Sequence, residues 1–313
     1  MATILITHGI PTAGLEALED HSIMMPAPLT AYSMDELRAL IPSADAVIAG
    51  GKLPGDVIRA GKRLKVIANY GAGYDGVDVA AAADCGIPVT NIPWTVTQPT
   101  AELAIALMLS VSRRIGELNL RLRREEPATL FGMGRLMGNT LSGRTLGIIG
   151  CGRIGSRVAQ IARALDMRVI AFGRHAIPPE VAEQCDLTTL LATADVISLH
   201  CPATPETRHL LNMEAFAAMK DGAVIINTAR GAVIDHAALV EALRSGKLSG
   251  AGLDVYPDEP NIPPELLAMD NVVCTPHVGA NTAQTRAQMA AACARQILDT
   301  LSGKRPESIV NGL

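Results

Sequence analysis

The second half of the chain holds three residues whose side chains suit acid-base chemistry and anion binding. They are Arg230, Glu259 and His277. Each follows an apolar run typical of a buried strand, and the runs are residues 223–227, 250–254 and 272–275. Because ligands of open α/β sheets bind beyond the carboxyl ends of the strands, we expect the three side chains at one sheet edge. A solvated arginine, a loop acid and a turn histidine would each be ordinary alone, but their joint placement predicts a shared site.

This set suits hydride transfer between a nicotinamide ring and a 2-oxo or 2-hydroxy acid. Arg230 can bind the substrate carboxylate and carbonyl through its planar fork of donors. His277 can give a proton to the carbonyl oxygen as hydride reaches the carbon, and can take it back in the reverse reaction. Glu259 would orient the imidazole and stabilise its charged form. The residues therefore predict an oxidoreductase.

A glycine-rich turn near the middle of the chain predicts a dinucleotide site. The apolar run 145–149 leads into Gly150, Gly152 and Gly155, and a helical pattern continues to residue 165. Gly150 permits the sharp turn, Gly152 lets the backbone approach the pyrophosphate, and Gly155 lets the helix pack on the strand. The N-terminus of that helix adds unpaired N–H groups for phosphate.

The end of the next predicted strand, 167–172, indicates which nicotinamide cofactor is bound. Sites that prefer NAD place an acidic residue there to bind the ribose 2′-hydroxyl. This chain has Gly173, Arg174 and His175 instead. Because a guanidinium suits a 2′-phosphate, we predict NADP(H), with NAD(H) as the alternative.

Composition and charge exclude several classes of protein. The 313 residues are 49% hydrophobic, which is enough for about two packed domains. The net charge of −4, with dispersed Lys and Arg, argues against a nucleic-acid or anionic-membrane partner. The longest uncharged stretch, 85–101, is interrupted by Gly and Pro and does not reach membrane length. Residues 1–9 are typical of a first strand, not of a signal peptide.

The cysteines indicate a reducing compartment. They occur singly in mostly apolar segments, without the paired spacing of a metal site, so no metal is predicted. We interpret them as reduced thiols of a cytoplasmic protein. They are Cys85, Cys151, Cys185, Cys201, Cys274 and Cys293.

Strand-like segments alternate with helical patterns along the chain, which is typical of an α/β fold. We predict two Rossmann-like or flavodoxin-like domains with doubly wound parallel sheets and a cleft between them. The dinucleotide-binding domain is expected at 100–282, and the substrate-binding domain at 1–99 plus 283–313. Beyond the strands already named, we predict strands at 3–7, 45–49, 64–68, 87–90 and 195–200, and long helices at 100–114 and 283–301.

Several segments spread over nearly the whole chain form a recognisable set. They are 69–75, Thr100-Ala101-Glu102, 150–155, 202–207, 226–231, 253–260 and 275–279. Together they resemble the D-isomer-specific 2-hydroxyacid dehydrogenase family. The resemblance implies Arg230, Glu259 and His277 as the catalytic residues and a homodimer as the assembly. It also implies that Asp254 faces the nicotinamide side of the cofactor.

These motifs and strand ends give the predicted binding residues. The resemblance implies that backbone N–H groups around Tyr70, Gly71 and Ala72 meet the substrate carboxylate, beside Arg230 and His277. Leu53, which follows the strand 45–49, is expected to touch the substrate side chain. The expected cofactor contacts are Thr100, Gly150, Gly152, Arg153, Ile154, Gly155, Gly173, Arg174, His175, Cys201, Pro202, Thr207, Thr228, Ala229, Asp254, His277 and Gly279.

The substrate is predicted by analogy within the family. Glyoxylate and hydroxypyruvate are common NADPH-linked substrates among its members, so a glyoxylate or hydroxypyruvate reductase is the first expectation. The loop 130–138 lacks the tryptophan that such reductases often carry, and Met133 and Met137 there favour bulkier 2-oxo acids. One alternative is an NAD-linked dehydrogenase of another D-2-hydroxy acid, namely D-lactate, 3-phosphoglycerate or the acid of a bulkier 2-oxo compound. The alternative from another class is a non-catalytic nucleotide-gated binding protein.

Overall fold

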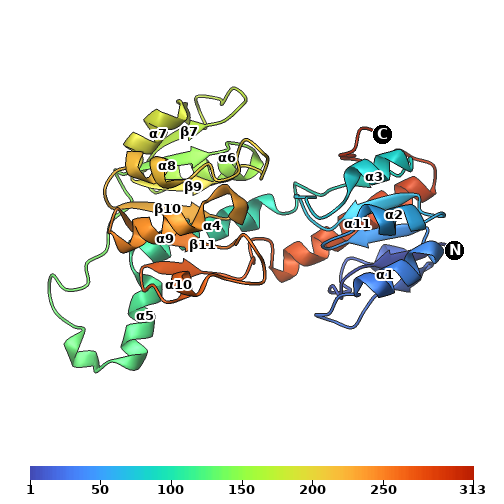
Figure 1. Cartoon of the computed structure of the whole chain (residues 1–313), viewed down its shortest axis with the longest axis horizontal. Coiled ribbons are helices and arrows are strands. Elements are labelled where there is room, and N and C mark those ends of the chain that lie inside the picture. Colours follow the sequence, from blue (N-terminus) through green and yellow to red (C-terminus); the bar gives the residue numbers. More distant parts are fainter. The chain divides into compact units, whose positions relative to one another are not determined.

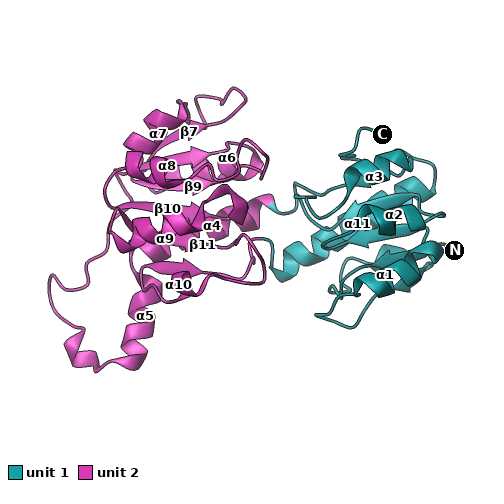
Figure 2. Ribbon diagram, in the orientation of Figure 1, with its two compact units in different colours: residues 1–96, 280–313 teal, residues 97–279 magenta.

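The computed structural model describes all 313 residues and divides them into two compact units (Figure 2). Unit 1 comprises Met1–Val96 and Ala280–Leu313, and unit 2 comprises Thr97–Gly279. The predicted boundaries, after residues 99 and 282, each lie three residues further along the chain. No helix in either unit is both long and apolar enough to cross a membrane.

Unit 1 is built on a five-stranded parallel sheet with the order β2-β1-β3-β4-β5. Its strands are β1 (Thr3–Ile6), β2 (Ser22–Met24), β3 (Ala46–Ala49), β4 (Val66–Asn69) and β5 (Val89–Thr90). Its helices are α1 (Met34–Leu40), α2 (Gly55–Ala60), α3 (Val79–Asp84) and α11 (Ala283–Leu301), with short 3-10 helices at Glu16–Leu18 and Ile41–Ser43. The strands β3 and β4 are buried along their whole length, which explains their continuous apolar sequences.

Unit 2 is built on a seven-stranded sheet with the order β12-β11-β10-β9-β6-β7-β8, and all its strand pairs are parallel. Its strands are β6 (Thr145–Ile149), β7 (Arg168–Phe172), β8 (Glu183–Gln184), β9 (Val196–Leu199), β10 (Ala223–Asn227), β11 (Leu248–Leu253) and β12 (Val272–Cys274). Its helices, labelled in Figure 1, are α4 (Thr97–Ser112), α5 (Ile115–Arg124), α6 (Arg153–Ala164), α7 (Leu187–Thr193), α8 (Met213–Ala218), α9 (His236–Arg244) and α10 (Pro264–Leu267), with 3-10 helices at Pro127–Thr129 and Gly231–Val233.

Helices cover both faces of the unit 2 sheet. On β10, Ile225 belongs to the apolar cluster that includes Leu239 of α9, while its neighbour Ile226 belongs to the cluster that includes Leu107 of α4. A Cβ on Gly252 of β11 would lie 2.9 Å from the Leu107 Cβ. Glycine at this position therefore lets α4 pack closely on the sheet.

The predicted fold class is confirmed, and every predicted strand is present. Two strands were missed, β2 and β8. Both residues of β8, Glu183 and Gln184, are exposed. Both missed strands are short edge strands, so they lack the apolar pattern by which buried strands are recognised. The two parallel sheets place all strand ends that carry predicted site residues at the carboxyl edge of one sheet or the other.

Candidate active site

The turn after β6 has the geometry that each of its three glycines predicted. Gly150 has a φ of +94°, and a Cβ there would lie 2.6 Å from the backbone nitrogen of Cys201. A Cβ on Gly155 would lie 2.3 Å from the carbonyl oxygen of Gly150, so only glycine lets α6 pack against the turn. Nothing lies within 4 Å of the Cβ position of Gly152, which directly precedes α6. Open space remains where a phosphate would approach the helix N-terminus.

A cavity of about 290 Å³ opens beside this turn, within unit 2. It lies between the ends of β6 and β9, where the strand order of the sheet reverses, as is usual for nucleotide sites of this fold. Predicted cofactor residues that line it are Gly150, Gly152, Gly173, Arg174, His175, Cys201, Pro202 and Thr207. Lining residues that the sequence reasoning missed are Ile149, Cys151, Phe172, Ala176, Ile177, His200, Thr204, Glu206 and Leu210.

The remaining predicted cofactor residues lie outside this cavity. Arg153, Ile154 and Gly155 form the first turn of α6, where backbone N–H groups have no partner within the helix. Thr228 and Ala229 follow β10. Thr100 of α4 lies against Gly279, since a Cβ added there would be 3.3 Å from the Thr100 hydroxyl.

Two buried polar atoms at the strand ends have no hydrogen-bond partner, namely His200 Nδ1 and Thr228 Oγ1. The other ring nitrogen of His200 lies 2.8 Å from the Ser198 hydroxyl. Burial lowers the pKa of His200 to about 4, so the ring is neutral at pH 7. Because buried polar atoms are rarely left unpaired, the two atoms and the cavity fit a bound nucleotide cofactor.

Arg174 is the charged residue at the end of β7, and it lines the cavity. Glu206 lines the same cavity. Its carboxylate accepts a hydrogen bond from the Thr204 hydroxyl, and this bond, with a smaller contribution from the charge of Arg174, lowers the pKa of Glu206. A guanidinium therefore stands where NAD-preferring sites carry an acid.

The histidine and the glutamate of the predicted catalytic set are in direct contact. His277 Nδ1 lies 2.7 Å from Glu259 Oε2. The other carboxylate oxygen, Oε1, accepts the backbone N–H of Tyr256 at 3.0 Å. Glu259 is thus held by its own loop while it holds the imidazole. The side chain of His277 remains 51% exposed, which leaves Nε2 available to a substrate.

Asp254 fixes the loop that carries His277. Its carboxylate is buried and accepts the Thr275 hydroxyl at 2.7 Å and the backbone N–H groups of Val278 and Gly279 at 2.8 and 2.9 Å. These bonds hold His277 in a left-handed conformation with a φ of 51°. The structure therefore gives Asp254 a positioning role, because its oxygens are bonded to this loop and only 1% of the residue is exposed.

Arg230 follows β10, the strand next to β11. Its Nη1 donates to the Ala229 carbonyl at 2.7 Å, and the Asn227 amide donates to the Arg230 carbonyl at 3.0 Å. A Cβ on Gly231 would lie 2.0 Å from the carbonyl carbon of Tyr256. The backbone after Arg230 thus contacts the loop that carries Glu259. The three catalytic candidates therefore lie at one end of the unit 2 sheet.

Three of the predicted substrate contacts in unit 1 need correction. The backbone N–H groups of Tyr70 and Gly71 already donate to the carbonyls of Ala49 and Asn69, at 2.8 and 2.9 Å. Ala72 is the member of this set whose N–H has no partner in the chain. The side chain of Leu53 is fully buried in the core of unit 1, since its backbone N–H bonds to the Gly76 carbonyl and turns the chain inward.

Comparison with known proteins decides the family. Residues 105–279 match the model of the D-isomer specific 2-hydroxyacid dehydrogenase NAD binding domain. The chain belongs to this family. It is 40% identical over 319 residues to D-3-phosphoglycerate dehydrogenase from Methanocaldococcus jannaschii, a match that covers 99% of this chain and 60% of that protein.

Solved structures agree with this membership. A crystal structure of a Thermus thermophilus protein matches with a TM-score of 0.92 and 40% identity, over 98% of this chain and 99% of that one. An NADPH-dependent glyoxylate/hydroxypyruvate reductase from Sinorhizobium meliloti matches with a TM-score of 0.88 and 30% identity, over 99% and 98% of the two chains. The predicted family is confirmed, and this D-2-hydroxyacid dehydrogenase family member is an oxidoreductase with a nicotinamide cofactor.

Proposed function

We propose that this dehydrogenase reduces a small 2-oxo acid, glyoxylate or hydroxypyruvate, to the corresponding 2-hydroxy acid with NADPH. The contact between His277 and Glu259 carries the proposal, because an oriented imidazole is the proton donor that reduction of a carbonyl requires. Arg230 on the neighbouring strand end supplies the cation that a 2-oxo acid requires. The S. meliloti reductase gives the substrate class by analogy.

Arg230, His277 and Glu259 each have a separate role in the proposed reaction. Arg230 binds the substrate carboxylate and polarises the carbonyl. The nicotinamide, when bound, supplies hydride to the carbonyl carbon. His277 Nε2–H gives its proton to the carbonyl oxygen, while Glu259 keeps the ring oriented through Nδ1. Proton donation of this kind contributes roughly 10² to 10⁴ in rate.

We propose NADP(H) over NAD(H) because of Arg174. Its guanidinium lines the cofactor cavity at the end of β7, the position of the acid in sites that prefer NAD. A related structure was solved with NADP and malonate, which agrees with this choice. The residues that would hold the cofactor are those of the glycine turn and α6 for the pyrophosphate, and Arg174 with His175 for the 2′-phosphate.

A second candidate is oxidation of 3-phosphoglycerate or D-lactate with NAD. The 40% identity to the M. jannaschii D-3-phosphoglycerate dehydrogenase favours it. One panel separates the two functions: oxidation of NADPH and of NADH with glyoxylate, hydroxypyruvate, pyruvate, phenylpyruvate and 2-oxoisocaproate, and reduction of both oxidised cofactors with 3-phosphoglycerate and D-lactate. The proposal requires the largest kcat/KM for NADPH with glyoxylate or hydroxypyruvate. Cofactor binding without turnover of any acid would instead support a binding protein.

We also propose a cytoplasmic homodimer. The segment 115–140, which we call the arm, extends from unit 2 (Figure 1) and carries apolar side chains that are mostly exposed. Phe131 is 74% exposed and Met133 is fully exposed. Burial of such side chains against a second copy would favour association. The six free cysteines fit a reducing compartment.

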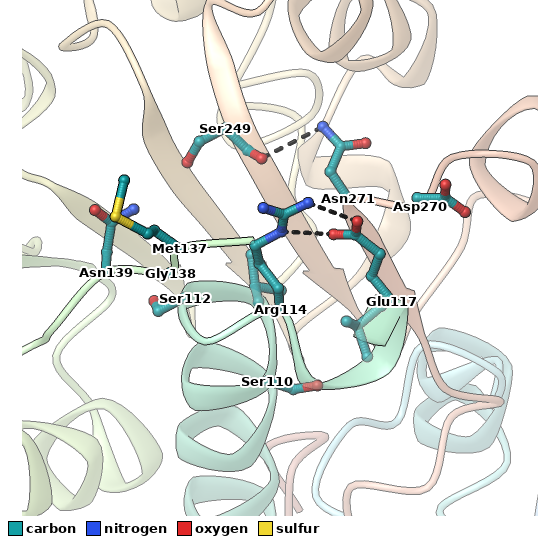
Figure 3. Close-up of a pocket in the computed structure, with 12 residues that line it drawn as sticks. Ser110, Ser112, Arg114, Glu117, Met137, Gly138, Asn139, Ser249, Asp270 and Asn271 are labelled. Carbon is teal, nitrogen blue, oxygen red and sulfur yellow. Dashed lines mark hydrogen bonds and ion pairs between the residues drawn. The ribbon is translucent and has the colours of Figure 1, made fainter. Parts of the chain in front are cut away.

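The base of the arm is ordered by ion pairs. Arg114, which has a left-handed φ of 55°, donates to both carboxylate oxygens of Glu117 at 2.6 and 2.7 Å (Figure 3). Together they line a pocket of about 270 Å³ with Met137 and Asn139 of the arm's far end. Light scattering of wild type and of Phe131→Glu/Met133→Glu tests the assembly. We expect wild type to be a dimer and the double variant to be a monomer. A monomeric wild type would contradict the proposed homodimer.

A further inference from the structure

The cofactor cavity of unit 2 carries a carboxylate that the predicted site did not include. Glu206 lies in the loop after β9, and it is the one acidic residue among those that line the cavity. Arg174 lines the same cavity from the end of β7. In the sheet order, β9 and β7 lie on either side of β6. Two opposite charges therefore flank the glycine turn that follows β6.

Hydrogen bonds order the loop that carries Glu206. The Thr207 hydroxyl accepts the Thr204 backbone N–H at 2.7 Å and donates to the Pro202 carbonyl at 2.6 Å. The backbone N–H groups of Thr207 and Arg208 both donate to the Thr204 carbonyl, at 3.1 and 2.9 Å. The Thr204 hydroxyl in turn donates to Glu206 Oε2 at 2.7 Å. The loop therefore holds the carboxylate in place, although Glu206 is exposed to solvent.

The positive charge of Arg174 acts on this side of the cavity. The hydrogen bond from Thr204 is the main cause of the lowered pKa of Glu206, and the charge of Arg174 adds to it. Burial raises the pKa of the Cys201 thiol to about 11, and the same charge opposes that rise. Neither a hydrogen bond nor an ion pair joins Arg174 to Glu206. The space between the guanidinium and the carboxylate is therefore open to a ligand.

The two nicotinamide cofactors differ in charge at this place. A dinucleotide site of this fold receives the adenosine ribose at the end of the second strand, which here is β7. The 2′-phosphate of NADP(H) carries a charge of about −2, whereas NAD(H) has a neutral hydroxyl there. A carboxylate in the same cavity repels the phosphate and has no such effect on the hydroxyl. Arg174 and Glu206 therefore act on cofactor choice in opposite directions.

We propose that Glu206 is a specificity-determining residue for the cofactor, because its carboxylate faces the same cavity as Arg174 and disfavours the 2′-phosphate of NADP(H). The inference rests on the proposed function and refines it. Arg174 favours the phosphorylated cofactor, and Glu206 limits how strong that preference is. The chain thus keeps an acidic residue at the cavity, on the loop after β9, where sites that prefer NAD carry theirs after the second strand.

The test is calorimetric titration of the full chain with NADPH and with NADH, which measures binding without turnover. In Glu206→Gln the ratio of Kd for NADH to Kd for NADPH rises about 3- to 10-fold at low salt, the effect of one exposed charge on a phosphate. The rise shrinks at about 0.5 M salt, because salt screens exposed charges. Glu214→Gln is the matched control, since it removes the same charge from an exposed side chain of α8, outside the cavity.

The results separate the role of Glu206 from the proposed function. A Kd ratio in Glu206→Gln that stays within roughly threefold of the wild-type ratio at low salt overturns the proposal, even if both affinities fall. An equal rise in Glu214→Gln also overturns it, since net charge alone would then be the cause. A wild type that binds neither dinucleotide refutes the proposed function itself. A wild type that prefers NADH contradicts the proposed cofactor, whereas a rise of the ratio in Glu206→Gln would still support the role of Glu206.

Discussion

The substitution Glu259→Gln tests how the catalytic histidine is held. Both groups that face the carboxylate are donors: His277 Nδ1–H at 2.7 Å from Oε2, and the Tyr256 backbone N–H at 3.0 Å from Oε1. An amide has the same shape but only one acceptor oxygen, and its NH₂ group is itself a donor. Glutamine can therefore satisfy one partner and must oppose the other.

The size of the effect follows from the lost bond. A hydrogen bond to a charged group contributes about 1.5 to 3 kcal/mol, which corresponds to roughly 10- to 150-fold in rate. The His277 side chain is 51% exposed and that of Glu259 is 34% exposed, so solvent weakens the interaction. We expect a loss of about 10- to 30-fold in kcat/KM for the 2-oxo acid.

The assay is NADPH oxidation at 340 nm with hydroxypyruvate or glyoxylate, beside direct titration of cofactor binding. Cofactor affinity should change little, because Glu259 contacts the histidine and its own loop. Asp258→Asn is the control, since the neighbouring carboxylate bonds only the exposed Asn261 amide at 3.0 Å. A kcat/KM of Glu259→Gln within twofold of the wild-type value would refute the reasoning.

Three further substitutions test other parts of the account. Arg174→Asp should lower the ratio of kcat/KM for NADPH over NADH at least tenfold, because it replaces a charge-assisted bond with repulsion; an unchanged ratio removes Arg174 from cofactor choice. Gly231→Ala should lower the free energy of unfolding in urea by about 1 to 3 kcal/mol and abolish most turnover, because its Cβ would overlap Tyr256. Gly116→Ala is the control: its Cβ would make only ordinary contacts, so both the free energy of unfolding and the turnover should stay unchanged. His200→Gln should make the free energy of unfolding less dependent on pH between about pH 6.5 and pH 4. In wild type the unfolded histidine gains a proton below pH 6.5, while the folded one stays neutral to about pH 4. The free energy of unfolding of wild type therefore falls by up to about 3 kcal/mol as the pH drops between these values. Equal pH slopes in the two proteins would contradict this.

The parts that the sequence predicted correctly depend on short stretches of chain. The glycine turn and its flanking strand and helix are consecutive, so spacing alone predicted the sharp turn at Gly150 and the close packing of α6 on β6. The shared sheet edge of Arg230, Glu259 and His277 was predicted from the general rule for strand ends, and their catalytic roles stay predictions. That rule depends only on the sheet being parallel.

The parts that it did not predict depend on contacts between distant residues. Leu53 lies in the loop after β3, where its N–H bonds to the Gly76 carbonyl and its side chain lies in the core of unit 1. The bond between Gly71 and Asn69 is likewise invisible in a sequence. His200 lines the cofactor cavity at the end of the predicted strand 195–200, so the rule for strand ends could have identified it.

The most direct test of the central claim compares wild type with His277→Ala in NADPH oxidation by hydroxypyruvate and glyoxylate. The account predicts turnover by wild type and a loss of at least about 100-fold in the variant, with cofactor affinity retained, because proton donation is removed. Turnover by His277→Ala close to that of wild type would contradict the assignment of the histidine as the proton donor.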